Sequence, residues 1–131
     1  MSEEAASILS HVSVGTNDAD RATAFYDAVM PVLGCRRMLE HPGAVSYGRA
    51  FPEFWVQVPA DGAAAAPGNG THVAFLAPDR QTVDAFHTTA LAAGATDASA
   101  PAQYGEPYYG CFVRDPDGNK IEAMFWDGPP P

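Results

Sequence analysis

The sequence has few basic residues, few cysteines and no long apolar run. Only 7 of its 131 residues are Lys or Arg, against 16 Asp or Glu, and the formal net charge is −9. Nucleic acids and anionic membranes are bound through basic surfaces, so this charge balance argues against both as partners. No apolar run approaches the roughly 20 residues that a membrane-spanning helix requires.

The two cysteines and the N-terminus point to a compartment without disulfides. Cys35 and Cys111 are too few and too far apart for a zinc knuckle or a disulfide scaffold. The first residues lack the basic start and apolar core of a secretory signal peptide, so we expect a cytoplasmic protein. With 131 residues, 47% of them hydrophobic, the chain fits one compact domain with a core of its own.

The sequence does contain an internal repeat that begins at two histidines. Residues 11–18 (HVSVGTND) precede a helix-like run that ends at Gly34, and residues 72–79 (HVAFLAPD) precede a similar run that ends at Gly94. When the two stretches are superposed, His11 coincides with His72, and the following valine and the aspartate also coincide. A repeat of this length indicates two copies of one supersecondary unit, each placing its histidine at an equivalent point.

Each copy is predicted to form a strand, a helix and three further strands. The expected strands of the first copy are 8–14, 35–40, 45–50 and 54–58, with a helix that Asp18 caps and Gly34 ends. The second copy has expected strands at 71–76, 96–98, 109–114 and 120–126, and a helix over 80–93. We therefore predict one α+β domain over 1–131, with module 1 at about 8–58, a linker at 59–70, module 2 at about 71–126 and a loose tail at 127–131.

The repeat also pairs four side chains that can bind a metal ion. His11 pairs with His72, and aligning 55–58 with 120–123 on their alternating pattern pairs Gln57 with Glu122. Two histidines and a carboxylate are a recurrent ligand set for a divalent metal with positions left open for substrate. The amide oxygen of Gln57 could complete a fourth position. A metal would also offset the cost of burying Glu122 in the apolar run 121–126.

Plainer roles exist for the same residues. A single histidine in a strand is more often a satisfied core residue than a ligand, Glu122 could face water at a sheet edge, and Gln57 could simply hydrogen-bond in a pocket. His41 and His87 are expected to face solvent because one lies in a turn and the other on a helix.

Other residues are candidates for the walls of a substrate pocket. Strand alternation places some of them on the same side as Gln57 or Glu122, and two tyrosines belong to an aromatic cluster that would cover an organic substrate or pack a loop. The candidate substrate-binding residues are Trp55, Tyr108, Tyr109, Lys120 and Met124.

Taken together, these features resemble the vicinal oxygen chelate superfamily, which includes glyoxalase I, extradiol dioxygenases, fosfomycin-resistance enzymes and bleomycin-resistance proteins. A histidine opens each βαβββ unit, and the motif Asp115-Pro-Asp-Gly-Asn119 is followed closely by Ile121-Glu122. The resemblance covers residues 8–126. It implies two modules that curl into a half-barrel around a shared metal and substrate site, commonly in a homodimer. It also implies His11, His72 and Glu122 as metal ligands, with Gln57 as an optional fourth.

The resemblance implies a glyoxalase-like enzyme that depends on one divalent metal ion. It would be a lyase or isomerase acting on a small carbonyl or vicinal-oxygen substrate, with Glu122 as the catalytic base. The metal, which could be nickel, zinc, manganese, cobalt or iron, would act as a Lewis acid that stabilises an enediolate. Gln57 departs from the glutamate that glyoxalase I carries at this position. Two alternatives stay open: an extradiol-type Fe(II) dioxygenase, and a non-catalytic protein that binds a small aromatic or drug-like molecule.

Overall fold

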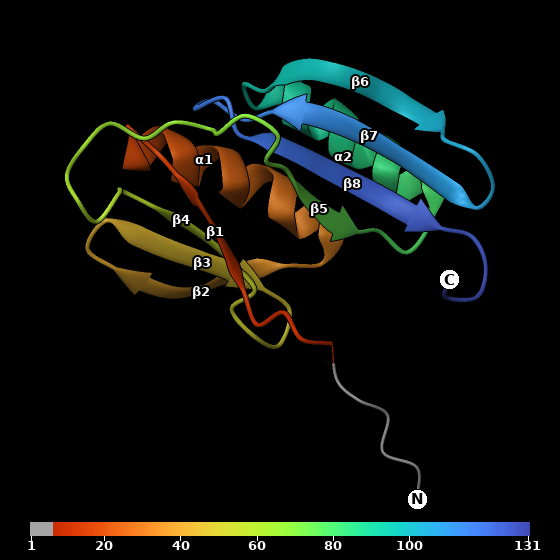
Figure 1. Ribbon diagram of the computed structural model, residues 1–131, viewed down its shortest axis with the longest axis horizontal. Helices are drawn as coiled ribbons and strands as arrows, with labels where there is room; N and C mark the ends of the chain where they lie inside the picture. The colour runs from red at the N-terminus through yellow and green to blue at the C-terminus, as the bar shows by residue number, and fades with distance from the viewer. Residues whose placement is uncertain (1–6) are drawn as a thin grey trace, which may run out of the picture.

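The computed structural model describes residues 7–131, which form two βαβββ modules (Figure 1). Module 1 contains β1 (Val12–Gly15), α1 (Ala19–Val29), the short 3-10 helix η1 (Met30–Leu33), β2 (Arg36–His41), β3 (Ala44–Gly48) and β4 (Phe54–Gln57). Module 2 contains β5 (Val73–Leu76), α2 (Arg80–Ala92), β6 (Thr96–Gln103), β7 (Tyr108–Arg114) and β8 (Lys120–Trp126). The prediction of an α+β fold with two tandem modules is confirmed.

Each module has its own four-stranded mixed sheet. The strand order is β1-β4-β3-β2 in the first and β5-β8-β7-β6 in the second. In both sheets the first strand runs parallel to the last strand of its module, and the other neighbours are antiparallel. In Figure 1, α1 runs across the first sheet and α2 across the second. The two helices also pack on each other, so the modules share one core.

One face of each sheet packs on a helix, and we call the other the open face. In β4, Phe54 and Val56 are buried, while Trp55 between them is half-buried on the open face. In β8, Ile121 and Ala123 are fully buried on the α2 side, and Glu122 points to the other side. Side chains on the open faces of the two sheets are therefore the ones placed to act on a ligand.

The caps predicted for both helices are present. Asp18 accepts a hydrogen bond from the Arg21 backbone N–H at 3.1 Å, and Asp79 accepts one from the Thr82 N–H at 2.7 Å. The first helix changes to 3-10 geometry at residue 30 because Pro31 cannot donate an α-helical hydrogen bond. Gly34 then ends it with a φ of 75°, a left-handed conformation that favours glycine.

Two strand boundaries differ by more than two residues from those predicted. The strand expected over 8–14 begins only at Val12, because β1 pairs with just four residues of β4, and Ile8 is 97% exposed. His11 therefore directly precedes β1, as His72 directly precedes β5. The strand expected over 96–98 continues to Gln103 despite Pro101, which is tolerated because β6 is an edge strand with register irregularities.

The turn at residues 115–119 joins the two modules, and we call it the junction turn. The buried hydroxyl of Tyr26 in α1 donates to Asp115 Oδ2 at 2.6 Å. Thr16 Oγ1 donates to Asp117 Oδ2 at 2.6 Å, and Asn119 Nδ2 donates to the Gly15 carbonyl at 2.9 Å. The motif that contributed most to the family resemblance is thus a structural link between the modules. No helix within residues 7–131 has the length and apolar character needed to cross a membrane.

Candidate functional site

The clearest polar site lies on the open face of the second sheet, where His72 meets Glu122. The Nε2 atom of His72 lies 3.1 Å from Oε1 of Glu122. The register of β5 with β8 places Ala74 beside Glu122, so the histidine just before β5 and the carboxylate share one face. The Glu122 side chain is 1% exposed, whereas His72 is 44% exposed. The buried carboxylate of Glu122 is therefore in contact with an imidazole that solvent can reach.

The second carboxylate oxygen of Glu122 accepts a hydrogen bond from the Tyr108 hydroxyl. Both residues lie on the open face, because Tyr108 pairs with Trp126 in β8 and Phe112 pairs with Glu122. Burial raises the pKa of Tyr108, and its contact with the Glu122 carboxylate raises it further. The phenol consequently remains protonated near neutral pH and acts as the donor.

Four aromatic side chains surround His72 and Glu122, and we call them the aromatic surface. Within it, Phe112 meets Tyr104 edge to face at 6.0 Å, and Tyr108 meets Tyr104 and Trp126 at 6.1 and 6.4 Å. The His72 ring in turn meets Phe112 edge to face at 5.9 Å. The Lys120 ammonium lies 4.8 Å from the centre of the Phe112 ring. The aromatic surface comprises Tyr104, Tyr108, Phe112 and Trp126.

The remaining predicted pocket residues of module 2 divide between two faces. Lys120 and Met124 share the open face with Glu122, as strand alternation predicts. Tyr109 does not: it lies on the opposite face, where its hydroxyl donates to Asp84 of α2 at 2.6 Å. The expectation that Tyr109 joins Tyr108 at the pocket is therefore wrong, because neighbouring residues of a strand point to opposite sides.

Module 1 places its predicted site residues on its own open face. His11 is exposed, and its Nδ1 lies 2.9 Å from the Ser10 hydroxyl. The Trp55 ring stacks on His41 with ring centres 5.8 Å apart and an interplanar angle of 9°. His41 is exposed as predicted, but His87 is not: it is buried and lies 2.9 Å from Asp97, because its side of α2 packs toward β6.

The pairing of Gln57 with Glu122 is corrected by strand register. Val12 opens β1 beside Phe54, and Val73 opens β5 beside Ile121. Because β1 and β5 are equivalent, Trp55 is the counterpart of Glu122, and Gln57 is the counterpart of Met124. The alignment made from the alternating pattern was two residues out of step. Module 1 has an indole, not an amide, at the position of the module 2 carboxylate.

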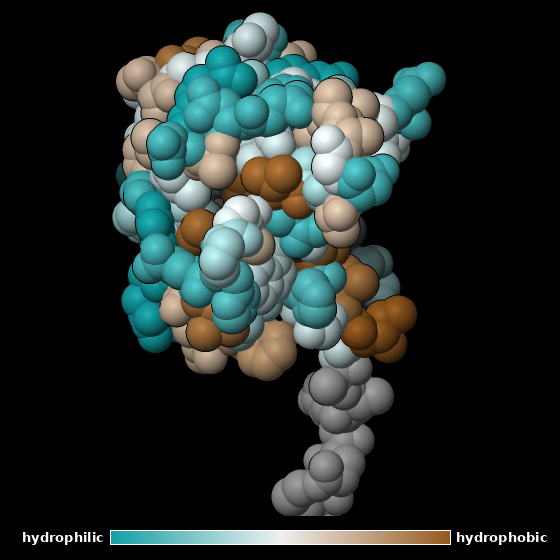
Figure 2. Space-filling view, turned by 90° about the vertical axis from the view of Figure 1, so that its left-hand side faces the viewer, coloured by the Kyte–Doolittle hydropathy of each residue, from teal (hydrophilic) through white to brown (hydrophobic). Residues whose placement is uncertain are grey.

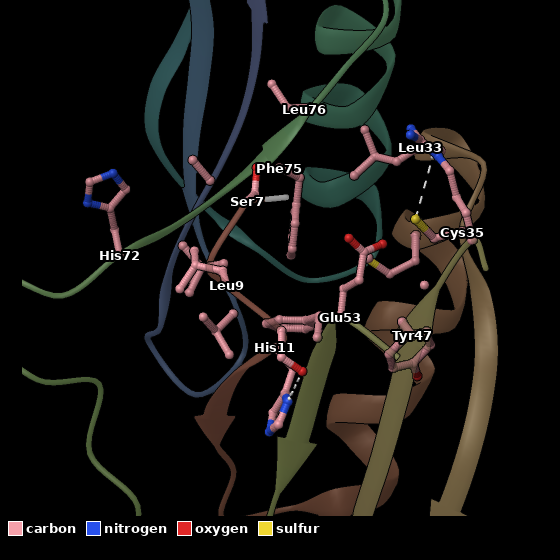
Figure 3. A pocket seen from close by; sticks show the side chains of 18 residues that line it. Ser7, Leu9, His11, Leu33, Cys35, Tyr47, Glu53, His72, Phe75 and Leu76 are labelled. Carbon is pink, nitrogen blue, oxygen red and sulfur yellow. Dashed lines mark hydrogen bonds between the residues drawn. The ribbon is translucent and has the colours of Figure 1, made fainter. Parts of the chain in front are cut away.

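A single chain does not bring the four predicted ligands to one point. Within residues 7–131, no three His, Cys, Asp or Glu side chains lie close enough together to hold a metal ion. A cavity of about 470 Å³ between the modules is lined by both His11 and His72 but not by Glu122. Figure 3 shows the two imidazoles on separate segments, pointing in different directions. The structure therefore joins His72 with Glu122 and leaves His11 apart.

The donor pair of module 2 nevertheless fits a divalent metal ion. One imidazole nitrogen and one carboxylate oxygen face each other on an open surface, and both are common ligands of zinc, nickel, manganese, cobalt and iron. The hydrogen bond from Tyr108 to the other oxygen is the kind of outer contact that orients a ligating carboxylate. The fold and this site together define a two-module βαβββ protein whose second module pairs an exposed histidine with a buried glutamate.

Comparisons with known proteins assign the family. The family model of the Glyoxalase/Bleomycin resistance protein/Dioxygenase superfamily matches residues 8–123. The chain is 35% identical to a glyoxalase/bleomycin resistance protein from Albidiferax ferrireducens T118, whose solved structure superposes with a TM-score of 0.85 over 91% of this chain and 98% of that one. This chain thus belongs to the Glyoxalase/Bleomycin resistance protein/Dioxygenase superfamily.

More distant solved structures share the fold. A glyoxalase/bleomycin resistance protein/dioxygenase family enzyme from Burkholderia phytofirmans PsJN has 21% identity and a TM-score of 0.71, covering 88% of this chain and 96% of its own. A lactoylglutathione lyase from Agrobacterium tumefaciens has 22% identity and a TM-score of 0.66, covering 93% and 95%. No match to the chain was found among curated proteins.

Proposed function

We propose that this chain is a divalent-metal-dependent lyase or isomerase that acts on a small carbonyl or vicinal-oxygen substrate. The observation that carries the proposal is the contact of His72 Nε2 with Glu122 Oε1 at 3.1 Å. Because Glu122 is 1% exposed, its carboxyl group is shielded from water, and a nearby positive charge would offset the cost of a negative charge there. A protonated His72 alone would also compensate that charge, and a metal titration distinguishes the two cases.

The third protein ligand in this proposal is His11 of a second copy. Catalytic metal sites commonly use three protein ligands, and no third His, Cys, Asp or Glu joins His72 and Glu122 within residues 7–131 of one chain. Apolar atoms gather at the lower right of Figure 2, where the described chain begins, and Ile8 and Leu9 beside His11 are 97% and 75% exposed. A homodimer that covers this segment would bring His11 to the partner's site.

Glu122 is the base in the proposed reaction. A bound metal would supply Lewis acidity that makes the proton beside a substrate carbonyl more acidic. The Oε1 atom of Glu122, which lies 3.1 Å from His72 Nε2, is the oxygen that would accept that proton, because Oε2 already accepts the hydrogen bond of Tyr108. Lys120, on the same face, would attract an anionic oxygen of the substrate.

Comparing the wild-type protein with Glu122→Gln tests this role. Each protein is loaded in turn with nickel, zinc, manganese, cobalt or iron, and metal affinity is measured by calorimetry. Turnover is measured by NMR as exchange of the substrate C–H proton for deuterium, with a panel of 2-oxoaldehydes and their thiol adducts. Since general base catalysis contributes about 10²–10⁴-fold, we expect the exchange rate to fall by at least about 100-fold, a larger loss than that in metal affinity. Equal exchange rates in the two proteins would rule out Glu122 as the base.

A second candidate function is the non-catalytic binding of a planar aromatic molecule. The aromatic surface favours it, because four connected rings beside one cation suit stacking on a flat ligand. Binding of planar aromatic compounds to metal-free protein can be followed by tryptophan fluorescence, with Phe112→Ala as the comparison. Tight binding without metal and without turnover would favour this function over the first.

A further inference from the structure

We propose that Tyr108 is a positioning residue that fixes the orientation of Glu122, so that one carboxylate oxygen is always presented toward His72. The inference rests on the proposed metal site and assigns it a supporting group outside the ligand set. It follows from three features of the open face of the second sheet: the two contacts of the Glu122 carboxylate, the space above Gly110, and the packing of the Tyr108 ring.

The first feature is that the two carboxylate oxygens of Glu122 contact different residues. Oε2 accepts the hydrogen bond of Tyr108, and Oε1 lies 3.1 Å from His72 Nε2. A glutamate side chain has a broad terminal torsion, so its carboxylate rotates freely unless one of its oxygens is held. Holding Oε2 therefore determines where Oε1 points.

The second feature is a glycine between the two residues. Tyr108, Gly110 and Phe112 occupy one side of β7, opposite Trp126, Met124 and Glu122 of β8. The Tyr108 ring leans along the sheet over Gly110 to reach Glu122. A Cβ atom on residue 110 would lie 3.2 Å from both Glu122 Oε2 and Tyr108 Cε1, closer than such atoms normally approach. The absence of a side chain at position 110 thus leaves room for the contact.

The third feature is that the Tyr108 ring is held on both sides. It meets Tyr104 and Trp126 edge to face, with ring centres 6.1 and 6.4 Å away. The phenol is therefore supported by packing that does not depend on its hydroxyl. Removal of the hydroxyl alone should leave the ring in place and free only the carboxylate.

The test compares Tyr108→Phe with Tyr109→Phe in the 131-residue chain. The two tyrosines are adjacent in β7, and each donates to a carboxylate, but Tyr109 bonds to Asp84 on the opposite face. Cobalt(II) alone is the probe, and its affinity is measured by calorimetry and its visible absorption bands are recorded. Because outer-shell partners of metal ligands typically contribute 10–100-fold in affinity, we expect Tyr108→Phe to bind cobalt about 10–100-fold more weakly with shifted bands. Tyr109→Phe should retain the wild-type affinity and spectrum.

The outcomes separate this inference from the proposed function. If Tyr108→Phe and Tyr109→Phe bind cobalt alike and with the same spectrum, Tyr108 does not position Glu122. If Glu122→Gln binds cobalt as tightly as the wild type, the metal site itself is wrong.

A crystal structure of metal-free Tyr108→Phe tests the positioning even if no metal binds. We expect Oε1 of Glu122 to have left hydrogen-bond distance of His72, and an unchanged contact would overturn the inference.

Discussion

Tyr26→Phe tests the link between the two modules, and its effect can be worked out from the structure. The Tyr26 hydroxyl is fully buried in α1 and donates to Asp115 of the junction turn at 2.6 Å. The change removes one oxygen atom and leaves the ring packing intact, so the loss of stability measures this one hydrogen bond.

The expected loss is about 2 kcal/mol. Hydrogen bonds to charged groups contribute about 1.5–3 kcal/mol, and Asp115 is only 4% exposed, so water cannot easily replace the lost donor. The value lies toward the lower end because Asp115 keeps other donors. Oδ1 accepts the backbone N–H groups of Asp117 and Asn119, and Oδ2 accepts Asn119 Nδ2, each at 2.9 Å.

Urea unfolding at equilibrium gives the measurement, and Tyr47→Phe is the matched control. Tyr47 is equally buried, but its partner Asp27 is 45% exposed, so we expect a loss below about 1 kcal/mol. For a urea dependence near 2 kcal/mol per molar, Tyr26→Phe should lower the midpoint by about 1 M. A midpoint unchanged by Tyr26→Phe, or lowered as much by Tyr47→Phe, would refute the reasoning.

Three further predictions follow from the register, the charges and the packing. Trp55→Glu should tighten zinc binding, measured by calorimetry, because it places a carboxylate at the module 1 position equivalent to Glu122. Gln57→Glu should not, because Gln57 is equivalent to Met124. Tighter zinc binding by Gln57→Glu than by Trp55→Glu would contradict the register argument. Burial and the nearby Asp115 raise the pKa of Tyr26, so its contribution to stability is complete below about pH 10 and is lost as the pH rises further. Denaturation curves against pH should show this loss in the wild type and less of it in Tyr26→Phe. Gly110→Ala should weaken cobalt binding by crowding the tyrosine–glutamate contact, and an unchanged affinity would argue against that contact.

The repeat in the sequence predicted the fold well because it reflects repeated structure directly. Matching positions after His11 and His72 indicated equivalent strands and helices, and β1 and β5 are indeed equivalent in register and direction. Equivalence did not predict proximity. Two symmetry-related histidines lie near each other only if the modules pack around them, and within one chain these two point apart.

Strand alternation predicted faces correctly but not positions along the strand. The pattern has a period of two, so a shift by two residues leaves every side chain on the same face. For this reason Gln57, and not Trp55, was aligned with Glu122, and only the pairing of β1 with β4 resolved the choice. The contact of Tyr108 with Glu122 was equally hidden, because it runs diagonally across the sheet over a glycine and joins residues that do not pair.

The most direct test of the proposed site is a complementation experiment with His11→Ala and His72→Ala. Each variant alone lacks one ligand of every site and should bind no zinc. If the metal is held by His11 of one copy and by His72 and Glu122 of the other, a mixed dimer has one intact site. Random pairing on co-expression should then restore about a quarter of the wild-type zinc content. Co-expressed protein with no more zinc than the single variants would contradict a site shared between copies.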